Sequence, residues 1–70
     1  MKDLVFECDK ENGECIILEY DTIMSFTDSI ETSSYKNYQN VDAIFFENPL
    51  LRKRFDSVEH LYHHCKAIIR

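Results

Sequence analysis

Residues 56–70, with the sequence DSVEHLYHHCKAIIR, predict an amphipathic helix that needs a surface to cover. Apolar side chains recur there every three or four residues, the spacing that places them on one stripe of a helix. Asp56 can cap the first turn, and Glu59 can reach back to it as in a capping box. We therefore predict a C-terminal helix over residues 57–69. Its apolar stripe consists of Val58, Leu61, Tyr62, Cys65, Ile68 and Ile69.

Residues 4–20, LVFECDKENGECIILEY, predict a β-hairpin with strands at 4–9 and 15–20. Both strands alternate in polarity, and Asn12-Gly13 between them is a strong turn signal. A type I turn with Gly13 in the left-handed conformation pairs Lys10 with Glu14. In that register one face of the hairpin is apolar throughout, which gives the helix a surface to cover. This face consists of Leu4, Phe6, Cys8, Ile16, Leu18 and Tyr20.

The residues that follow the hairpin are less clearly patterned. Residues 21–31 fit a strand or a helix, and their Ser and Thr residues lower helix propensity, which favours a strand. Residues 31–40 are polar and predict a loop. Residues 42–47 contain the run Ala43-Ile44-Phe45-Phe46, which is typical of a short strand buried on both faces.

Two interpretations of residues 49–55 remain open. Residues 50–54 can form a last strand that enters the helix, or Asn48 can cap a longer helix that begins at Pro49 and runs on to Arg70. The apolar spacing supports the longer helix, whereas the cap at Asp56 favours a break there. In both cases residues 1–70 form a single α+β domain. Its small antiparallel sheet of three to four strands is covered on one face by the C-terminal helix.

Composition excludes several classes of protein. A hydrophobic content of 44% with 13% aromatic residues argues against disorder. No apolar run reaches the length of a membrane span and none resembles a signal peptide, so we expect a cytoplasmic protein that does not enter membranes. The cysteines number three, and such a protein should keep them reduced. The hairpin register points Cys8 inward and Cys15 outward.

The acidic residues are concentrated in the N-terminal half. The net charge is −5, and residues 1–31 alone carry nine acids and two bases. Carboxylates on the second face of the hairpin alternate with apolar groups, a mixture that suits protein recognition because charge steers the encounter and apolar area holds the complex. Such carboxylates can also imitate the phosphates of a nucleic acid. The predicted partner-binding residues are Glu7, Asp9, Glu11, Glu14, Ile17 and Glu19.

Other chemistry has weaker support in the sequence. One glycine cannot form a phosphate-binding loop, and acidic neighbours make Cys15 a poor nucleophile, so we do not expect an enzyme or a cofactor. His60 and His64 lie four residues apart and can share a metal, but no pair of cysteines stands at metal-ligand spacing. The basic run Arg52–Arg54 can contact phosphate.

We therefore expect a non-enzymatic interaction module that binds a protein with a basic surface. Small acidic proteins of phages and mobile elements often inhibit nucleic-acid enzymes, so an inhibitor or adaptor of a nucleic-acid-binding complex is the sharper form of this hypothesis. The alternative is a small metal- or nucleic-acid-binding module that uses the helix histidines or the basic run. A homodimer formed through Val5 and Ile17, or through an uncovered sheet edge, is a further possibility.

Overall fold

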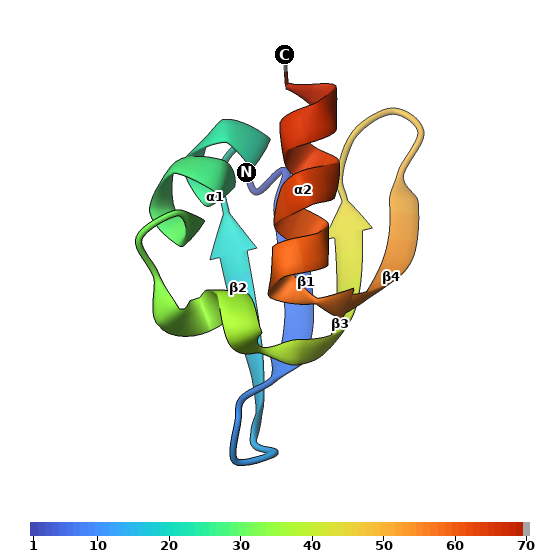
Figure 1. Cartoon of the computed structure of the whole chain (residues 1–70). Coiled ribbons are helices and arrows are strands. Elements are labelled where there is room, and N and C mark those ends of the chain that lie inside the picture. The colour runs from blue at the N-terminus through green and yellow to red at the C-terminus, as the bar shows by residue number, and fades with distance from the viewer. Residues whose placement is uncertain (70) are drawn as a thin grey trace.

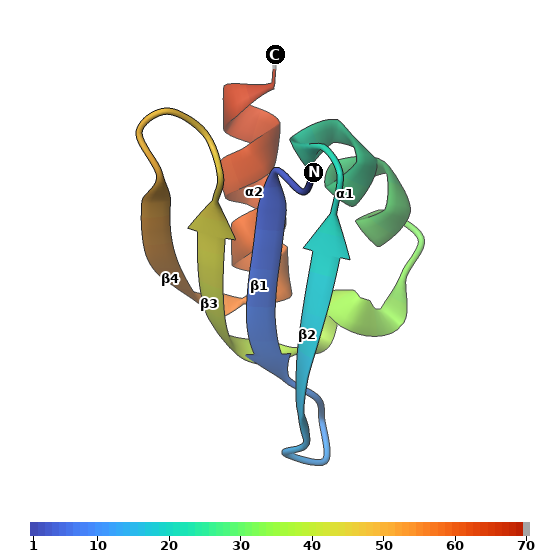
Figure 2. The same cartoon turned by 180° about the vertical axis from the view of Figure 1, so that it is seen from behind.

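The computed structural model describes residues 1–69, which form a four-stranded antiparallel sheet with both α-helices on one side (Figure 1). The strand order is β2-β1-β3-β4, and the other side of the sheet is uncovered (Figure 2). The predicted α+β class is therefore confirmed. The elements are β1 (Leu4–Asp9), β2 (Cys15–Tyr20), α1 (Ile23–Ile30), the 3-10 helix η1 (Ser34–Asn37), β3 (Gln39–Phe45), β4 (Leu51–Ser57) and α2 (Val58–Ile68).

The N-terminal hairpin has the predicted strands and the predicted register, from Leu4 opposite Tyr20 to Asp9 opposite Cys15. The Lys10 amide donates to the Glu14 carbonyl at 2.8 Å, and the Gly13 amide donates to the Lys10 carbonyl at 2.8 Å. Gly13 has a φ of 86°, which a residue with a Cβ rarely adopts. The turn chemistry of Asn-Gly therefore sets which side chains face the core.

Phe6 lies at the centre of the core because β1 is an inner strand. Its ring stacks on Tyr20 at a centroid distance of 6.0 Å and meets the edge of Phe26 at 5.4 Å. Strand β3 and helix α2 close the core from the other side. The fully buried apolar residues are Leu4, Phe6, Cys8, Phe26, Ile30, Val41, Ala43, Phe45, Val58, Leu61 and Cys65.

The strand favoured for residues 21–31 is wrong, because Ile23–Ile30 form helix α1. The hydroxyl groups that lower helix propensity here cap the helix instead. Thr22 Oγ1 accepts from the Ser25 amide at 2.9 Å, and Ser25 Oγ lies 3.2 Å from the Thr22 amide. Phe26 and Ile30, one turn apart, are fully buried, so core packing outweighs propensity.

The predicted cap at Asp56 is also wrong by one residue. Ser57 is the N-cap of α2, and its hydroxyl accepts from the His60 amide at 3.3 Å. Asp56 lies within β4, so of the two interpretations of residues 49–55 the strand is correct. The helix accordingly spans 58–68 rather than 57–69, and Ile69 is its C-cap.

Strand β3 begins earlier than predicted and is buried on one face only. Val41, Ala43 and Phe45 are buried against the helices, whereas Asp42 and Ile44 are half-buried on the uncovered side. Its pairing with β1 is irregular next to Asp9, where Asn40 has a φ of 55°. Asparagine tolerates this left-handed conformation better than other non-glycine residues. The predicted loop at 31–40 contains η1 and the first residues of β3.

The position of the α2 cap can be tested by two alanine substitutions. Ser57→Ala should lower the free energy of unfolding by about 1 kcal/mol, because it removes the acceptor for an amide of the first turn. Asp56→Ala removes no cap and should change that free energy by less than about 0.5 kcal/mol. Urea denaturation measures both, and a larger loss for Asp56→Ala would contradict the observed cap.

Candidate functional site

The candidate site is the uncovered side of the sheet, which we call the open face. Side chains alternate along a strand, so the register decides which residues reach it. The pairing of Val5 with Glu19 and Ile44, and of Glu7 with Ile17 and Asp42, aligns them in rows across the strands. The open face comprises Val5, Glu7 and Asp9 of β1, Cys15, Ile17 and Glu19 of β2, Asp42 and Ile44 of β3, and Arg52 and Arg54 of β4.

Asp42, the acid nearest to β4 on the open face, is neutralised by arginine. Arg52 holds the Asp42 carboxylate through two hydrogen bonds, from Nε at 3.0 Å and from Nη2 at 2.6 Å. Arg54 lies 4.0 Å from the same carboxylate. The hydrogen bond from Arg52 holds the pKa of Asp42 below its usual value. Two cations of the predicted basic run are thus engaged with an acid of the same face.

The third cation of the basic run points elsewhere. Lys53 pairs with Ala43, which is buried on the helix side of the sheet. Its Nζ lies 5.8 Å from the centroid of the Phe55 ring. Residues 52–54 therefore do not present their three charges together on one face of the sheet.

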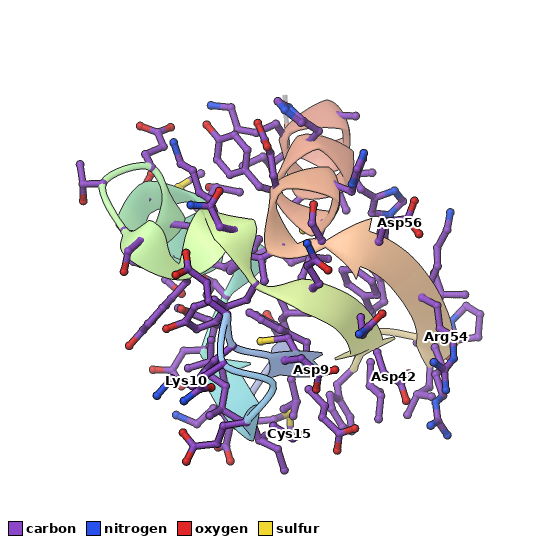
Figure 3. The ribbon with its side chains drawn as sticks, turned by 60° about the horizontal axis from the view of Figure 1, so that its bottom comes forward. Asp9, Lys10, Cys15, Asp42, Arg54 and Asp56 are labelled. Carbon is purple, nitrogen blue, oxygen red and sulfur yellow. The ribbon has the colours of Figure 1, made fainter. Side chains whose placement is uncertain are left out.

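The β1–β2 side of the open face keeps its negative charge, and we call Glu7, Asp9 and Glu19 with the apolar groups beside them the acidic half. Among the described residues, no Lys or Arg forms an ion pair with any of these three carboxylates. Asp9 accepts a hydrogen bond from Asn40 Nδ2 at 2.8 Å, which leaves its charge in place. Figure 3 shows Cys15 at one end of the open face and Arg54 at the other, with Asp9 and Asp42 between them.

The structure brings four of the six predicted binding residues together and places two apart. Glu7, Asp9, Ile17 and Glu19 share the open face, as the hairpin register predicts. Glu11 and Glu14 lie in the turn between β1 and β2. Glu14 is paired with Lys10 Nζ at 3.0 Å, so of these two only Glu11 adds unneutralised charge among the described residues.

Sequence reasoning did not place Asp42 and Ile44 on this face. Ile44 lies opposite Val5 through the β1–β3 pairing, and a shallow pocket of about 190 Å³ lies between Val5, Ile17 and Ile44. The alternation of side chains along residues 42–47 predicts that Asp42 and Ile44 share a face. It does not predict that their strand pairs with β1, which lies almost forty residues away in sequence.

The three histidines of α2 have separate surroundings. His60 Nδ1 lies 2.9 Å from Ser57 Oγ, and His63 lies 3.8 Å from Glu59. His64 packs against Phe45 and Phe55, at ring-centroid distances of 5.7 and 5.3 Å. Burial, and to a lesser extent Lys53, lowers the pKa of His64. Within residues 1–69, no three His, Cys, Asp or Glu side chains are arranged to hold a metal ion.

Comparisons with protein-family models, with curated proteins and with solved structures find no match for this chain. Within the described residues, no helix combines the length and the apolar character needed to cross a bilayer.

The three cysteines are free thiols, and Cys8 is buried and Cys15 exposed, as the hairpin register predicts. Burial raises the pKa of Cys8 to about 11 and that of Cys65 to about 12. Cys15 is exposed, and its pKa is raised mainly by partial desolvation and to a lesser extent by the charges of Glu7 and Asp9.

The burial of the cysteines can be tested by chemical labelling. In the native protein a thiol reagent should label Cys15 alone, whereas in the unfolded chain it should label all three cysteines. Mass spectrometry of the labelled protein measures this, and rapid native labelling of Cys8 would contradict the register.

His64 should make stability depend on pH. Its pKa is lowered in the folded state, so the neutral ring is favoured by folding, and this contribution is complete above the ordinary value of 6.5. The free energy of unfolding should fall as the pH drops below 6.5. His64→Phe should remove that part of the decrease, because phenylalanine keeps the ring contacts and does not titrate. Urea denaturation between pH 5 and 8 measures it, and the exposed His63, changed to Gln, is the control that should retain the decrease.

Proposed function

We propose that this protein is a non-enzymatic interaction module that binds the basic surface of a partner protein through the acidic half of the open face. The observation that carries the proposal is the contrast between Asp42 and its neighbours. Asp42 forms ion pairs with Arg52 and Arg54, whereas among the described residues Glu7 and Glu19 form none with Lys or Arg. The charges of Arg52 and Lys2 reach Glu7 and Glu19 only over a longer distance. Carboxylates that are not paired with a cation of the same protein raise the rate of encounter with a basic partner.

Apolar groups beside these carboxylates supply the contact area that charge alone does not. Ile17 is 61% exposed, and Val5 and Ile44 are half-buried on the same face. An apolar centre with a charged rim is the usual composition of a protein interface. The surroundings of Cys15 support a non-enzymatic role, because carboxylates rather than an imidazole lie beside this exposed thiol.

The size of the open face limits how a partner can bind. Four strands about 4.8 Å apart and six residues long present roughly 400 Å², about half of what each side of a standard interface buries. A partner therefore has to contact more than the open face. Glu11 in the hairpin turn and the edge of β2 adjoin the acidic half and would extend the contact.

The sharper form of the proposal is that the partner is a nucleic-acid-binding protein and that this chain inhibits it or recruits it to another protein. The basic groove of such a partner is adapted to a row of phosphates, and a row of carboxylates can occupy it. In this arrangement the chain contacts the protein and not the nucleic acid.

The charge requirement can be tested by reversing three acids. Glu7→Lys, Asp9→Lys and Glu19→Lys together should weaken binding to the cellular partner by about tenfold or more, because each places a cation against a basic surface. Pull-down from nuclease-treated lysate, with quantitative mass spectrometry, measures the loss. Thermal unfolding of the triple variant confirms that it folds, and the double change at Glu7 and Glu19 is the substitute if Asp9→Lys disturbs the sheet.

A matched control changes the net charge equally elsewhere. Asp28, Glu47 and Glu59 are exposed and lie outside the open face, on α1, on the loop between β3 and β4, and on α2. Changing these three to Lys should leave the partner bound. Equal losses in both triple variants, or no loss in either, would contradict the proposed site. Partners that disappear after nuclease treatment of the wild-type sample would point to bound nucleic acid instead.

A further inference from the structure

The sheet has two edges of opposite character. Strand β4 carries Arg52, Lys53 and Arg54 in succession, so cations lie on both of its faces. Consecutive charges of this kind protect an edge strand from pairing with another chain. Strand β2 forms the other edge, and among its six residues, Cys15–Tyr20, there is no proline, lysine or arginine.

The backbone of β2 is regular and available for pairing. Its register with β1 continues without a break over all six residues. The hydrogen bond from the Lys10 amide to the Glu14 carbonyl fixes the alternation along the hairpin, so the N–H and C=O groups of Cys15, Ile17 and Glu19 point away from β1. In the described part of the chain, no backbone group outside the strands donates to or accepts from them. Figure 2 shows no strand beyond β2.

The side chains beside this edge differ between its two faces. On the open face, Cys15, Ile17 and Glu19 alternate next to Glu7 and Asp9 of β1. On the helix side, Ile16, Leu18 and Tyr20 are only half-buried and pack against the margin of the core. A strand added here would find carboxylates on one side and apolar surface on the other.

We propose that the partner binds by adding an extended strand antiparallel to β2, with basic side chains toward the open face and apolar side chains toward the helices. This inference rests on the proposed function and specifies how the partner binds. Main-chain hydrogen bonds supply affinity in strand addition, and alternate side chains supply specificity. The added strand also extends the contact beyond the limited area of the open face.

Charge selects a basic partner over a second copy of the chain. Antiparallel pairing of two β2 strands would bring two acidic halves side by side, each with Glu7, Asp9 and Glu19 unneutralised by Lys or Arg among the described residues. Like charges placed across neighbouring strands destabilise a sheet. A strand that carries lysine or arginine at alternate positions relieves this repulsion.

The probe is the peptide Lys-Val-Lys-Val-Lys-Val-Lys, added to the isotopically labelled protein at low salt and millimolar concentration. Amide hydrogen exchange, read by NMR, should slow at Cys15, Ile17 and Glu19, whose N–H groups become paired. Ile16 and Leu18 point their amides toward β1 and should not change. Unaltered exchange at all three outward amides would overturn the proposal, and so would equal protection by a peptide with Glu in place of Lys.

Backbone methylation of the peptide tests the geometry without altering the protein. In antiparallel pairing, residues directly opposite one another share a face, and those opposite Cys15, Ile17 and Glu19 exchange both hydrogen bonds with them. The lysine amides therefore point at β2 and the valine amides point away. N-methylation of the central lysines should weaken binding about tenfold or more, because it leaves β2 acceptors unpaired, whereas N-methylation of the valines should leave affinity nearly unchanged. Equal effects of the two modifications would overturn strand addition.

The inference can fail while the proposed function stands. If reversal of Glu7, Asp9 and Glu19 releases the cellular partner, but Cys15, Ile17 and Glu19 still exchange freely in the complex with that partner, the acidic half binds by another mode. If the reversal releases nothing, the proposed function fails first. Slowed exchange at the three amides in that complex supports both.

Discussion

The burial of one face of β1 is the constraint on which the rest of the structure depends. A chain of 70 residues can enclose only a small core, and here Leu4, Phe6 and Cys8 lie at its centre. Both helices are needed to cover that face, since Phe26 of α1 contacts the Phe6 ring while α2 contributes Val58, Leu61 and Cys65. Within residues 1–69 no further element covers the other side of the sheet, so the outward residues of the four strands face solvent.

The charges of the open face are divided by strand order. Strand β3 lies between the basic strand β4 and the acidic hairpin, so Asp42 is the acid that forms ion pairs with Arg52 and Arg54, while Glu7 interacts with Arg52 only over a longer distance. A bidentate pair of this kind satisfies both groups. The acids Glu7, Asp9 and Glu19 lie one and two strands further from β4, so negative charge is concentrated on the β1–β2 side of the open face.

Turn signals and side-chain alternation are sufficient to predict the hairpin. Patterns of this local kind fail for the elements whose structure depends on packing against the rest of the chain. The Asn12-Gly13 turn predicts the register, and the register predicts that Glu7, Asp9, Ile17 and Glu19 share a face. Helix α1 was missed because serine and threonine disfavour a helix on average, whereas here Thr22 and Ser25 form its cap and Phe26 anchors it. Asp56 and Ser57 are both good caps in sequence, and only the end of β4 determines which is used. The neighbourhood of Ile44 depends on strand order, for which sequence alone carries no local signal.

The acidic half is poorly explained as a device for stability. Glu7 and Asp9 lie on one face of β1 and Glu19 lies on the same face of β2, and like charges gathered on one face disfavour the compact state. Elsewhere on the same sheet an acid is paired, since the Asp42 side chain is 15% exposed and held by an arginine. The exposed Ile17 adds a second unfavourable feature at the same place, as apolar surface left in water. Two unfavourable features on one edge of the sheet, beside unpaired backbone groups, would be relieved together by the basic strand that we propose.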